Sequence, residues 1–396
     1  MQKLGVLFEK HQAQTTTYPM GIEIIRAKGC YLYDQNNKRY LDLIAGVSAC
    51  SLGHRHPKVV RAIKKQLRKY LHVMVYGEFV QKEPVLLTKL LADNLPNPLD
   101  TTYLTNSGTE AIEGALKLAK RVTGRAEIIA ANNAYHGNTM GAMSVMGYEE
   151  RKSAYRPLIP GTLFIDFNDF DAVDQITTKT AAIILETIQG GAGFIQPEKE
   201  YLKRVKKRCE EVGALLILDE IQPGMGRTGK LFAFMDHGIV PDILVTGKGL
   251  GGGLPVGAFI AAQHHMAQLK EAPSLGHITT FGGNPVIAAA CRATLSTILS
   301  RNLMAETLKK EQLFRELLLH KKIKEIRGKG LMLALIMDSP ETAQQLVKQS
   351  IKNGLLLFFL LFEPKAVRIS PPLTISKKQI KHACQKILQV LDGLNC

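Results

Sequence analysis

The chain has 396 residues, of which 45% are hydrophobic and 22% charged, which is the composition of an ordinary globular protein large enough for two lobes. Its longest apolar run, residues 354–362, is far shorter than the roughly 20 residues that a membrane span needs, and the N-terminus lacks a signal-peptide pattern, so we expect a cytoplasmic protein without a membrane partner. The net charge of +16 comes from short basic runs with helical periodicity, which indicates solvated helix faces rather than a nucleic-acid surface.

The predicted elements begin with a hairpin in residues 29–43 (GCYLYDQNNKRYLDL), where strand-like alternation flanks an Asp-Gln-Asn-Asn turn. Strand-like runs then alternate with helical segments, of which residues 198–213 are the clearest. The runs are TTYLTN (101–106), AEIIAANNAY (126–135), TLFIDF (162–167), TAAIILETIQ (180–189), ALLILDEIQ (214–222) and PDILVTGKG (241–249). Such alternation predicts an α/β fold with a mainly parallel sheet covered by helices.

The last hundred residues show a different pattern. Helices at about 286–318 and 340–353, and a closing helix from about 376, flank short strands at 330–338, 355–362 and 366–372. We read the apolar run at 354–362 as a buried strand. The predicted parts are therefore an N-terminal segment (1–45) that packs with the small domain, a large domain (46–290) and a smaller α+β domain (291–396).

The ends of the predicted strands are the first candidates for a site, because ligands bind outside the carboxyl ends of strands in open parallel sheets. The turn Ser107-Gly108-Thr109 connects the strand at 101–106 to an amphipathic helix that begins at about residue 109. Two hydroxyls and a glycine beside the free amides of a helix N-terminus would suit a phosphate group. A plain N-cap by Ser107 or Thr109 is the alternative.

Two further strand ends carry charged residues. Lys248 follows an apolar strand and precedes glycines, so burial would lower its pKa and make it a nucleophile for carbonyls; a surface lysine before a glycine turn is the alternative. Asp219 ends another apolar strand, where a buried carboxylate needs a cationic partner, either a protonated ring nitrogen or an Arg or Lys. Together, a phosphate site, an aldehyde-reactive lysine and an acid for a ring nitrogen describe pyridoxal 5'-phosphate (PLP).

With these residues in view, the sequence resembles the class III aminotransferases, the acetylornithine, ornithine and 4-aminobutyrate family of PLP enzymes. The resemblance covers nearly the whole chain. It runs from YLDLIAGVSACSLGHRHP (40–57) through TNSGTEAIEGALKLAK (105–120), AYHGNT (134–139), LILDEIQPGMGRTG (216–229) and GKGLGGGLPVGA (247–258) to TTFGGNP (279–285) and VRISPPL (367–373). It implies a fold-type-I PLP-dependent transferase, with a mainly parallel sheet in the large domain and a smaller α+β domain.

The resemblance also implies which residues bind the cofactor. Lys248 would form the Schiff base and move the proton, Asp219 would pair with the ring nitrogen, and Gln222 would lie near the ring hydroxyl. The other implied cofactor-binding residues are Ser107, Gly108 and Thr109 at the phosphate, Tyr135 on the ring face, and His136. Thr280 would reach the phosphate of the neighbouring subunit, so the resemblance implies a homodimer with shared active sites.

Substrate residues follow from the same resemblance. Arg368 would bind a substrate carboxylate through a bidentate fork, and Glu186 matches a glutamate that can pair with this arginine. Ordinary surface ion pairs are the alternative for both residues. Four positions near the substrate entrance depart from the family pattern, namely Asn138, Thr187, Gly191 and Pro223. Asn138 stands where relatives acting on ornithine or acetylornithine carry an arginine for a substrate carboxylate.

These observations predict an aminotransferase that moves an amino group from an acetylornithine- or ornithine-like donor to a 2-oxo acid, namely 2-oxoglutarate. An aminomutase, epimerase or decarboxylase on the same fold is the nearer alternative. Six cysteines lack C-x-x-C spacing, and no His/Cys cluster has zinc-site spacing, so we expect reduced thiols and no metal.

A more distant alternative is an NAD-dependent dehydrogenase, because Gly224, Gly226 and Gly229 spell G-x-G-x-x-G after a strand. No long helix follows these glycines, and the next strand ends on a lysine instead of the acidic residue that the pattern requires. We therefore interpret the glycines as a turn-rich loop that leads away from the site, near the subunit interface.

Overall fold

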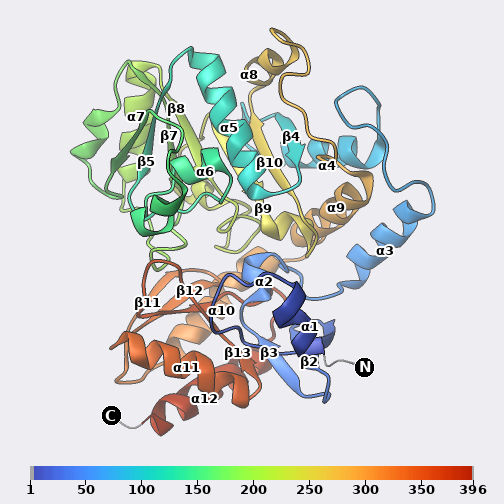
Figure 1. Cartoon of the computed structure of the whole chain (residues 1–396), viewed down its shortest axis with the longest axis vertical. Helices are drawn as coiled ribbons and strands as arrows, with labels where there is room; N and C mark the ends of the chain where they lie inside the picture. The colour runs from blue at the N-terminus through green and yellow to red at the C-terminus, as the bar shows by residue number, and fades with distance from the viewer. Residues whose placement is uncertain (1–3, 395–396) are drawn as a thin grey trace.

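A seven-stranded sheet forms the large lobe of the protein, whose computed structural model describes residues 4–394 (Figure 1). The strands are β4 (Thr101–Thr105), β5 (Glu127–Ala131), β6 (Thr162–Ile165), β7 (Thr180–Glu186), β8 (Leu215–Asp219), β9 (Ile243–Gly247) and β10 (Gly257–Ala261). Their order is β4-β10-β9-β8-β7-β5-β6, and β10 alone runs antiparallel to its neighbours. The predicted parallel sheet is confirmed, whereas β10 was not predicted from the sequence.

Helices cover both faces of this sheet because its strands are apolar on both sides. Alternate residues of β8 belong to different clusters: Leu215 and Ile217 pack with the α5 side, and Leu216 and Leu218 with the α7 side. The helices of this lobe are α3 (Pro57–Leu67), α4 (Lys82–Ala92), α5 (Gly108–Thr123), α6 (Met140–Ser144), α7 (Tyr201–Val212), α8 (Gln263–Met266) and α9 (Pro285–Ser300). The predicted helix from about residue 109 is thus α5, and it begins directly beside the sheet edge.

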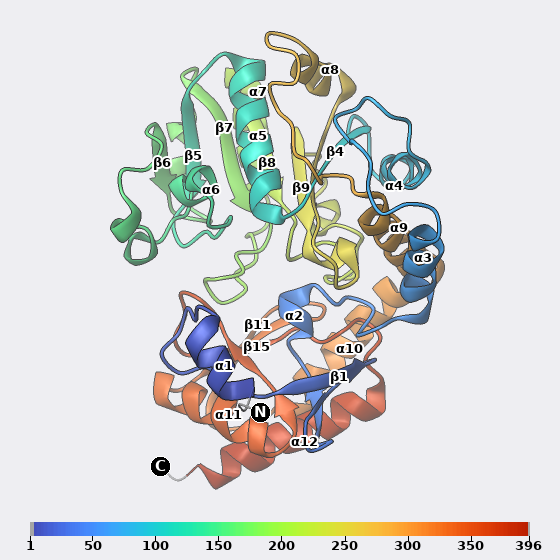
Figure 2. The ribbon, with the colours of Figure 1, turned by 45° about the vertical axis from the view of Figure 1, so that its right-hand side comes forward.

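Two small sheets and three helices form the second lobe, which lies below the first in Figures 1 and 2. One sheet has the order β11-β12-β15-β14, from Ile323–Lys329, Met332–Met337, Ala366–Ile369 and Phe358–Phe359. The other has the order β1-β2-β3-β13, from Ile24–Lys28, Tyr31–Asp34, Arg39–Asp42 and Leu355–Leu356. The helices are α10 (Leu303–Leu317), α11 (Pro340–Lys352) and α12 (Lys377–Gly393). The short helix α1 (Leu4–His11) belongs to the N-terminal segment, and α2 (Ala45–Ser48) begins at the end of that segment.

The predicted hairpin is confirmed, since β2 and β3 pair antiparallel. Leu41 of β3 stands opposite Leu355 of β13 in a parallel pair, so the N-terminal segment shares a sheet with the C-terminal one. The run at 354–362 is not one buried strand: β13 joins the N-terminal sheet, β14 pairs with β15, and Phe358 is 39% exposed. The apolar residues of this run therefore pack in two different sheets, and some of them line a cavity.

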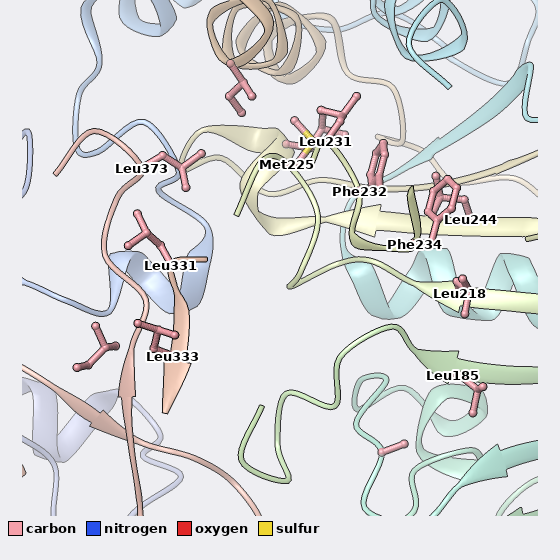
Figure 3. Close-up of a cluster of buried hydrophobic side chains, with 14 of the residues drawn as sticks. Leu185, Leu218, Met225, Leu231, Phe232, Phe234, Leu244, Leu331, Leu333 and Leu373 are labelled. Carbon is pink, nitrogen blue, oxygen red and sulfur yellow. The ribbon is translucent and has the colours of Figure 1, made fainter. Parts of the chain in front are cut away.

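The loop with the G-x-G-x-x-G pattern lies inside the chain, at the junction of the two lobes. A side chain at Gly226 would stand 3.2 Å from Ile298 and Met304, and one at Gly229 would stand 2.7 Å from Leu308. Figure 3 shows the apolar side chains of this junction, which continue from the sheet through the loop to the small lobe (labelled are Leu185, Leu218, Leu244, Met225, Leu231, Phe232, Phe234, Leu331, Leu333 and Leu373). The glycines are therefore enclosed by the two lobes of their own chain.

Within residues 4–394, no helix combines the length and apolar character that crossing a membrane would require.

Candidate active site

A cavity of about 620 Å³ lies at the carboxyl ends of the parallel strands and is closed below by β14 and β15 of the small lobe. Its walls bring together the predicted Ser107, Gly108, Thr109, Tyr135, His136, Glu186, Asp219, Gln222, Lys248 and Arg368. Thr280 is exposed on the loop before α9 and does not line the cavity. Residues from six separate stretches of sequence thus converge where the topology of an open parallel sheet places a ligand.

The turn before α5 is built to hold an anion. Ser107 is the N-cap, and its hydroxyl accepts a hydrogen bond from the amide of Glu110 at 3.3 Å, so the capping alternative holds for this hydroxyl. The amides of the first helical turn have no acceptor within the helix itself. A side chain at Gly108 would stand 2.6 Å from Ile221, and one at Gly137 would stand 2.3 Å from the Thr109 hydroxyl. Both positions therefore require glycine, because other groups pack closely around the helix N-terminus that could hold a phosphate.

Asp219 ends β8 with a partner that the sequence did not identify. One oxygen of its buried carboxylate accepts a hydrogen bond from His136 Nδ1 at 2.8 Å, and the other accepts one from the Ile221 amide at 2.9 Å. The alternative of an Arg or Lys partner is not realised. His136 Nε2 is buried and has no hydrogen-bond partner among residues 4–394. The ring of His136 therefore fixes the carboxylate that faces the cavity.

Lys248 projects into the cavity from the turn after β9. Within the described chain, its amine has no hydrogen-bond or ion-pair partner. Burial lowers the pKa of Lys248 to about 8, and repulsion from Arg368 adds to the effect. At neutral pH a larger fraction of this amine is unprotonated than in an ordinary lysine, so it is a better nucleophile toward an aldehyde.

The predicted pair of Glu186 and Arg368 does not form in this structure. The Glu186 carboxylate instead accepts hydrogen bonds from the amides of Tyr135 and Gly190, each at 2.9 Å, and burial raises its pKa to about 7. Arg368 is 5% exposed, and its Nε and Nη1 lack hydrogen-bond partners within residues 4–394. Burial lowers the pKa of Arg368 to about 10. Neither residue forms a surface ion pair, and the unpaired guanidinium can bind a carboxylate.

Several wall residues could not be found by sequence reasoning. Phe358 stands opposite Arg368 in the β14–β15 pair, so both side chains lie on one face of the sheet. Val47 lines the cavity from a left-handed turn, in which residues 45–48 all have positive φ, between 50° and 69°. Of these four residues, only Gly46 adopts a positive φ without strain. The β-branched Val47 therefore gives no indication in the sequence that a left-handed turn forms here.

Two departures from the family pattern have structural explanations. The Thr187 hydroxyl donates to the fully buried Glu220 at 2.8 Å, which proline could not do. Glu220 also accepts the amides of Ala233 and Phe234, so this carboxylate supports the fold. At Gly191, a side chain would stand 2.6 Å from the ring of Phe362. The glycine therefore makes room for that ring.

This fold and site define a class of protein, the fold-type-I enzymes that use PLP. The residues fit the cofactor: a helix N-terminus with close backbone for a phosphate, a buried carboxylate for a ring nitrogen, and an unpaired lysine for an aldehyde. Gln222 Nε2 and His136 Nε2 are buried polar atoms without a partner in the described part of the chain, as expected where a polar ligand completes the site.

Comparison with known proteins gives the family. The model of the class-III aminotransferases matches residues 12–391, so the chain belongs to that family. It is 37% identical to the acetylornithine aminotransferase of Caldanaerobacter subterraneus over 98% of each chain, and 39% identical to the putrescine aminotransferase of Pectobacterium atrosepticum over 98% of this chain and 86% of the relative. Among solved structures, the ornithine aminotransferase of Toxoplasma gondii matches with a TM-score of 0.91 at 31% identity, covering 98% of this chain and 94% of that one. The protein is therefore a PLP-dependent aminotransferase, whose substrates are an amino donor and a 2-oxo acid.

Proposed function

We propose that the protein transfers the terminal amino group of an acetylornithine- or ornithine-like donor to 2-oxoglutarate. The observation that carries this proposal is the single cavity in which the unpaired amine of Lys248 and the unpaired, buried guanidinium of Arg368 both lie. The first suits reaction with an aldehyde, and the second suits binding of a carboxylate. Relatives that act on acetylornithine and putrescine support an amine at the end of a short carbon chain.

The residues predicted to bind the cofactor each have a role in this proposal. When bound, PLP supplies an electron sink for bonds at the amino-bearing carbon. Lys248 would hold the cofactor and move a proton at that carbon, while Asp219, fixed by His136, would keep the ring nitrogen protonated. The Ser107–Thr109 turn would hold the phosphate, and the resemblance assigns Tyr135 to the ring face and Gln222 to the ring hydroxyl; all of these residues line the cavity.

Arg368 binds the carboxylate of each substrate in turn. Glu186 is held by two backbone amides, so it leaves the guanidinium free for a carboxylate while it stays in that position. Because burial raises the pKa of Glu186 to about 7, this carboxyl is partly protonated at neutral pH and neutralises Arg368 only weakly.

We also propose that the enzyme is a homodimer. Thr280 is the one predicted site residue that lies outside the chain's own cavity, and it is exposed. This position suits a contribution to the phosphate site of a second copy. Sedimentation of the purified protein at twice the monomer mass would support the proposal, and a monomer with full activity would contradict it.

The test of the proposed reaction is a donor panel with 2-oxoglutarate, comprising acetylornithine, ornithine, 4-aminobutyrate and putrescine. We expect glutamate to form with at least one of these donors, and Lys248→Ala to abolish it. Chiral analysis and carbon dioxide release are measured in parallel. Racemisation, rearrangement or decarboxylation without glutamate would replace the proposal by one of the other PLP reactions.

A further inference from the structure

Arg151 contacts Leu361, a residue of the cavity wall, and has no role in the site described so far. It ends the short 3-10 helix Glu149–Arg151, and its Nη2 donates a long hydrogen bond of 3.4 Å to the carbonyl of Leu361. Its guanidinium also lies 5.8 Å from the ring centre of Phe362. Since Leu361 is part of the cavity wall, these contacts place the charge of Arg151 beside that wall.

The position of Arg151 beside the cavity rests on its contact with Leu361. Tyr135 also lines the cavity, and the positive charge of Arg151 partly offsets the rise that burial causes in the pKa of this phenol. The guanidinium itself is exposed.

An aromatic platform orients this arginine. The ring of Phe362 stacks on Tyr148, with centres 4.4 Å apart and planes inclined by 14°, and its amide donates to the carbonyl of Gly191 at 2.9 Å. The platform needs glycine at 191, because a side chain there would run into the ring. Gly191, one of the departures from the family pattern, thus makes room for the ring of Phe362 that lies beside Arg151.

No carboxylate of the described chain neutralises Arg151. Glu149 pairs with Arg156 at 2.8 Å, and Glu363 lies 3.7 Å from Arg327. Glu150 accepts a hydrogen bond from the Tyr148 hydroxyl and lies beyond ion-pair distance of Arg151. An arginine without an acidic partner, held at a cavity mouth by a carbonyl and a ring, can bind an anion that enters the cavity.

We propose that Arg151 binds the second carboxylate of the acceptor, at the mouth of the cavity, while Arg368 binds the first in its depth. Asn138 lines the same cavity and is neutral, so Arg151 supplies the charge that this position lacks. The inference rests on the proposed function and extends it, because it names the residue that selects dicarboxylic acceptors over monocarboxylic ones.

The kinetic test compares 2-oxoglutarate with pyruvate, which has only one carboxylate. For Arg151→Met, we expect KM for 2-oxoglutarate to rise about tenfold, the loss expected for an exposed charge-assisted contact, with KM for pyruvate changed less than about twofold. Arg151→Lys should restore part of the affinity. Arg156→Met is the matched control, an exposed arginine of the same segment that pairs with Glu149, and it should leave both values unchanged. Equal changes for both acceptors, or none for either, would overturn the inference.

A binding test separates failure of this inference from failure of the proposed function. Calorimetry of the PLP-loaded protein with glutarate and with valerate reports on the two carboxylate positions without any reaction. We expect Arg151→Met to weaken glutarate about tenfold and valerate little. If the parent protein makes no glutamate but shows this binding pattern, the proposed reaction fails and the inference stands. If Arg151→Met leaves glutarate binding intact while the parent protein makes glutamate, the inference fails alone.

Discussion

The Ser107–Thr109 turn before α5 lies directly against Gly257, the first residue of β10. A side chain at Gly257 would place its Cβ 1.9 Å from the carbonyl oxygen of Ser107 and 2.5 Å from the Thr105 hydroxyl. The first distance is 1.1 Å inside the 3.0 Å that real Cβ atoms keep from other heavy atoms. Because the obstacle is backbone held between β4 and α5, Gly257→Ala must displace Ser107 by about this amount.

Ser107 cannot move alone. Its carbonyl accepts the amide of Ala111 at 3.1 Å and the Thr105 hydroxyl at 2.9 Å, so the first turn of α5 moves with it. Overpacking of this kind costs about 1–3 kcal/mol of stability, and a misplacement of about 1 Å at a site can cost about 100-fold in rate. We expect Gly257→Ala to weaken PLP binding at least about tenfold, equivalent to about 1.4 kcal/mol.

The assay is titration of the cofactor-free protein with PLP, followed by visible absorbance, together with urea unfolding of the same protein. Gly393→Ala is the control, because no atom lies within 4 Å of the added methyl group. If Gly257→Ala bound PLP as tightly as the parent, the phosphate would not be held by the Ser107–Thr109 turn as proposed. Lower stability with unchanged PLP affinity would refute the reasoning in the same way.

Three further predictions concern a lysine, a buried carboxylate and a buried arginine. The rate at which cofactor-free protein binds PLP should rise with pH and level off above about pH 8, because the neutral amine of Lys248 reacts and its pKa is lowered to about 8. The rate is measured by stopped-flow absorbance. A rate that keeps rising until the pH reaches the ordinary lysine pKa of about 10.5 would contradict this prediction. Thr187→Val should lower the free energy of unfolding by about 1–2 kcal/mol, since Glu220 loses the hydroxyl at 2.8 Å, and urea unfolding with unchanged PLP affinity checks it. Arg227 is 1% exposed and donates hydrogen bonds to the carbonyls of Leu331 and Pro371 in the small lobe. Arg227→Met should therefore displace the strand end that carries Arg368 and raise KM for carboxylate substrates. Steady-state kinetics in which only kcat falls would argue against that positioning role.

The half of the site that we propose binds the cofactor could be predicted, because its residues lie at strand ends. Asp219 and Lys248 each close an apolar strand, and the topology of a parallel sheet brings such ends to one edge. The fold of the large lobe was predictable for the same reason, from the alternation of strands and helices. β10 escaped prediction because its run, Gly257–Ala261, follows a glycine-rich turn and has little of the β-branched pattern that identifies a strand.

The arrangement of the half of the site that we propose binds substrates could not be predicted, because it depends on contacts between segments that are distant in the sequence. No sequence pattern indicates that Leu361 lies beside Arg151, or that Phe358 stands opposite Arg368. The pair of Glu186 and Arg368 was expected from resemblance alone, whereas the backbone amides of Tyr135 and Gly190 satisfy the carboxylate locally. Such local competition for a hydrogen-bonding group is decided by geometry that the residue types do not specify.

The apolar junction around Met225 and Leu231 has a consequence for how the chain unfolds. One hydrophobic cluster includes Leu218 and Leu244 of the large sheet as well as Leu333 of the small lobe. The predicted domain boundaries at residues 45 and 290 therefore separate parts of the chain with different strand arrangements, but these parts share one hydrophobic core. The two lobes should melt in one cooperative transition, and a fragment cut at residue 290 would expose half of a shared interior and fail to fold alone.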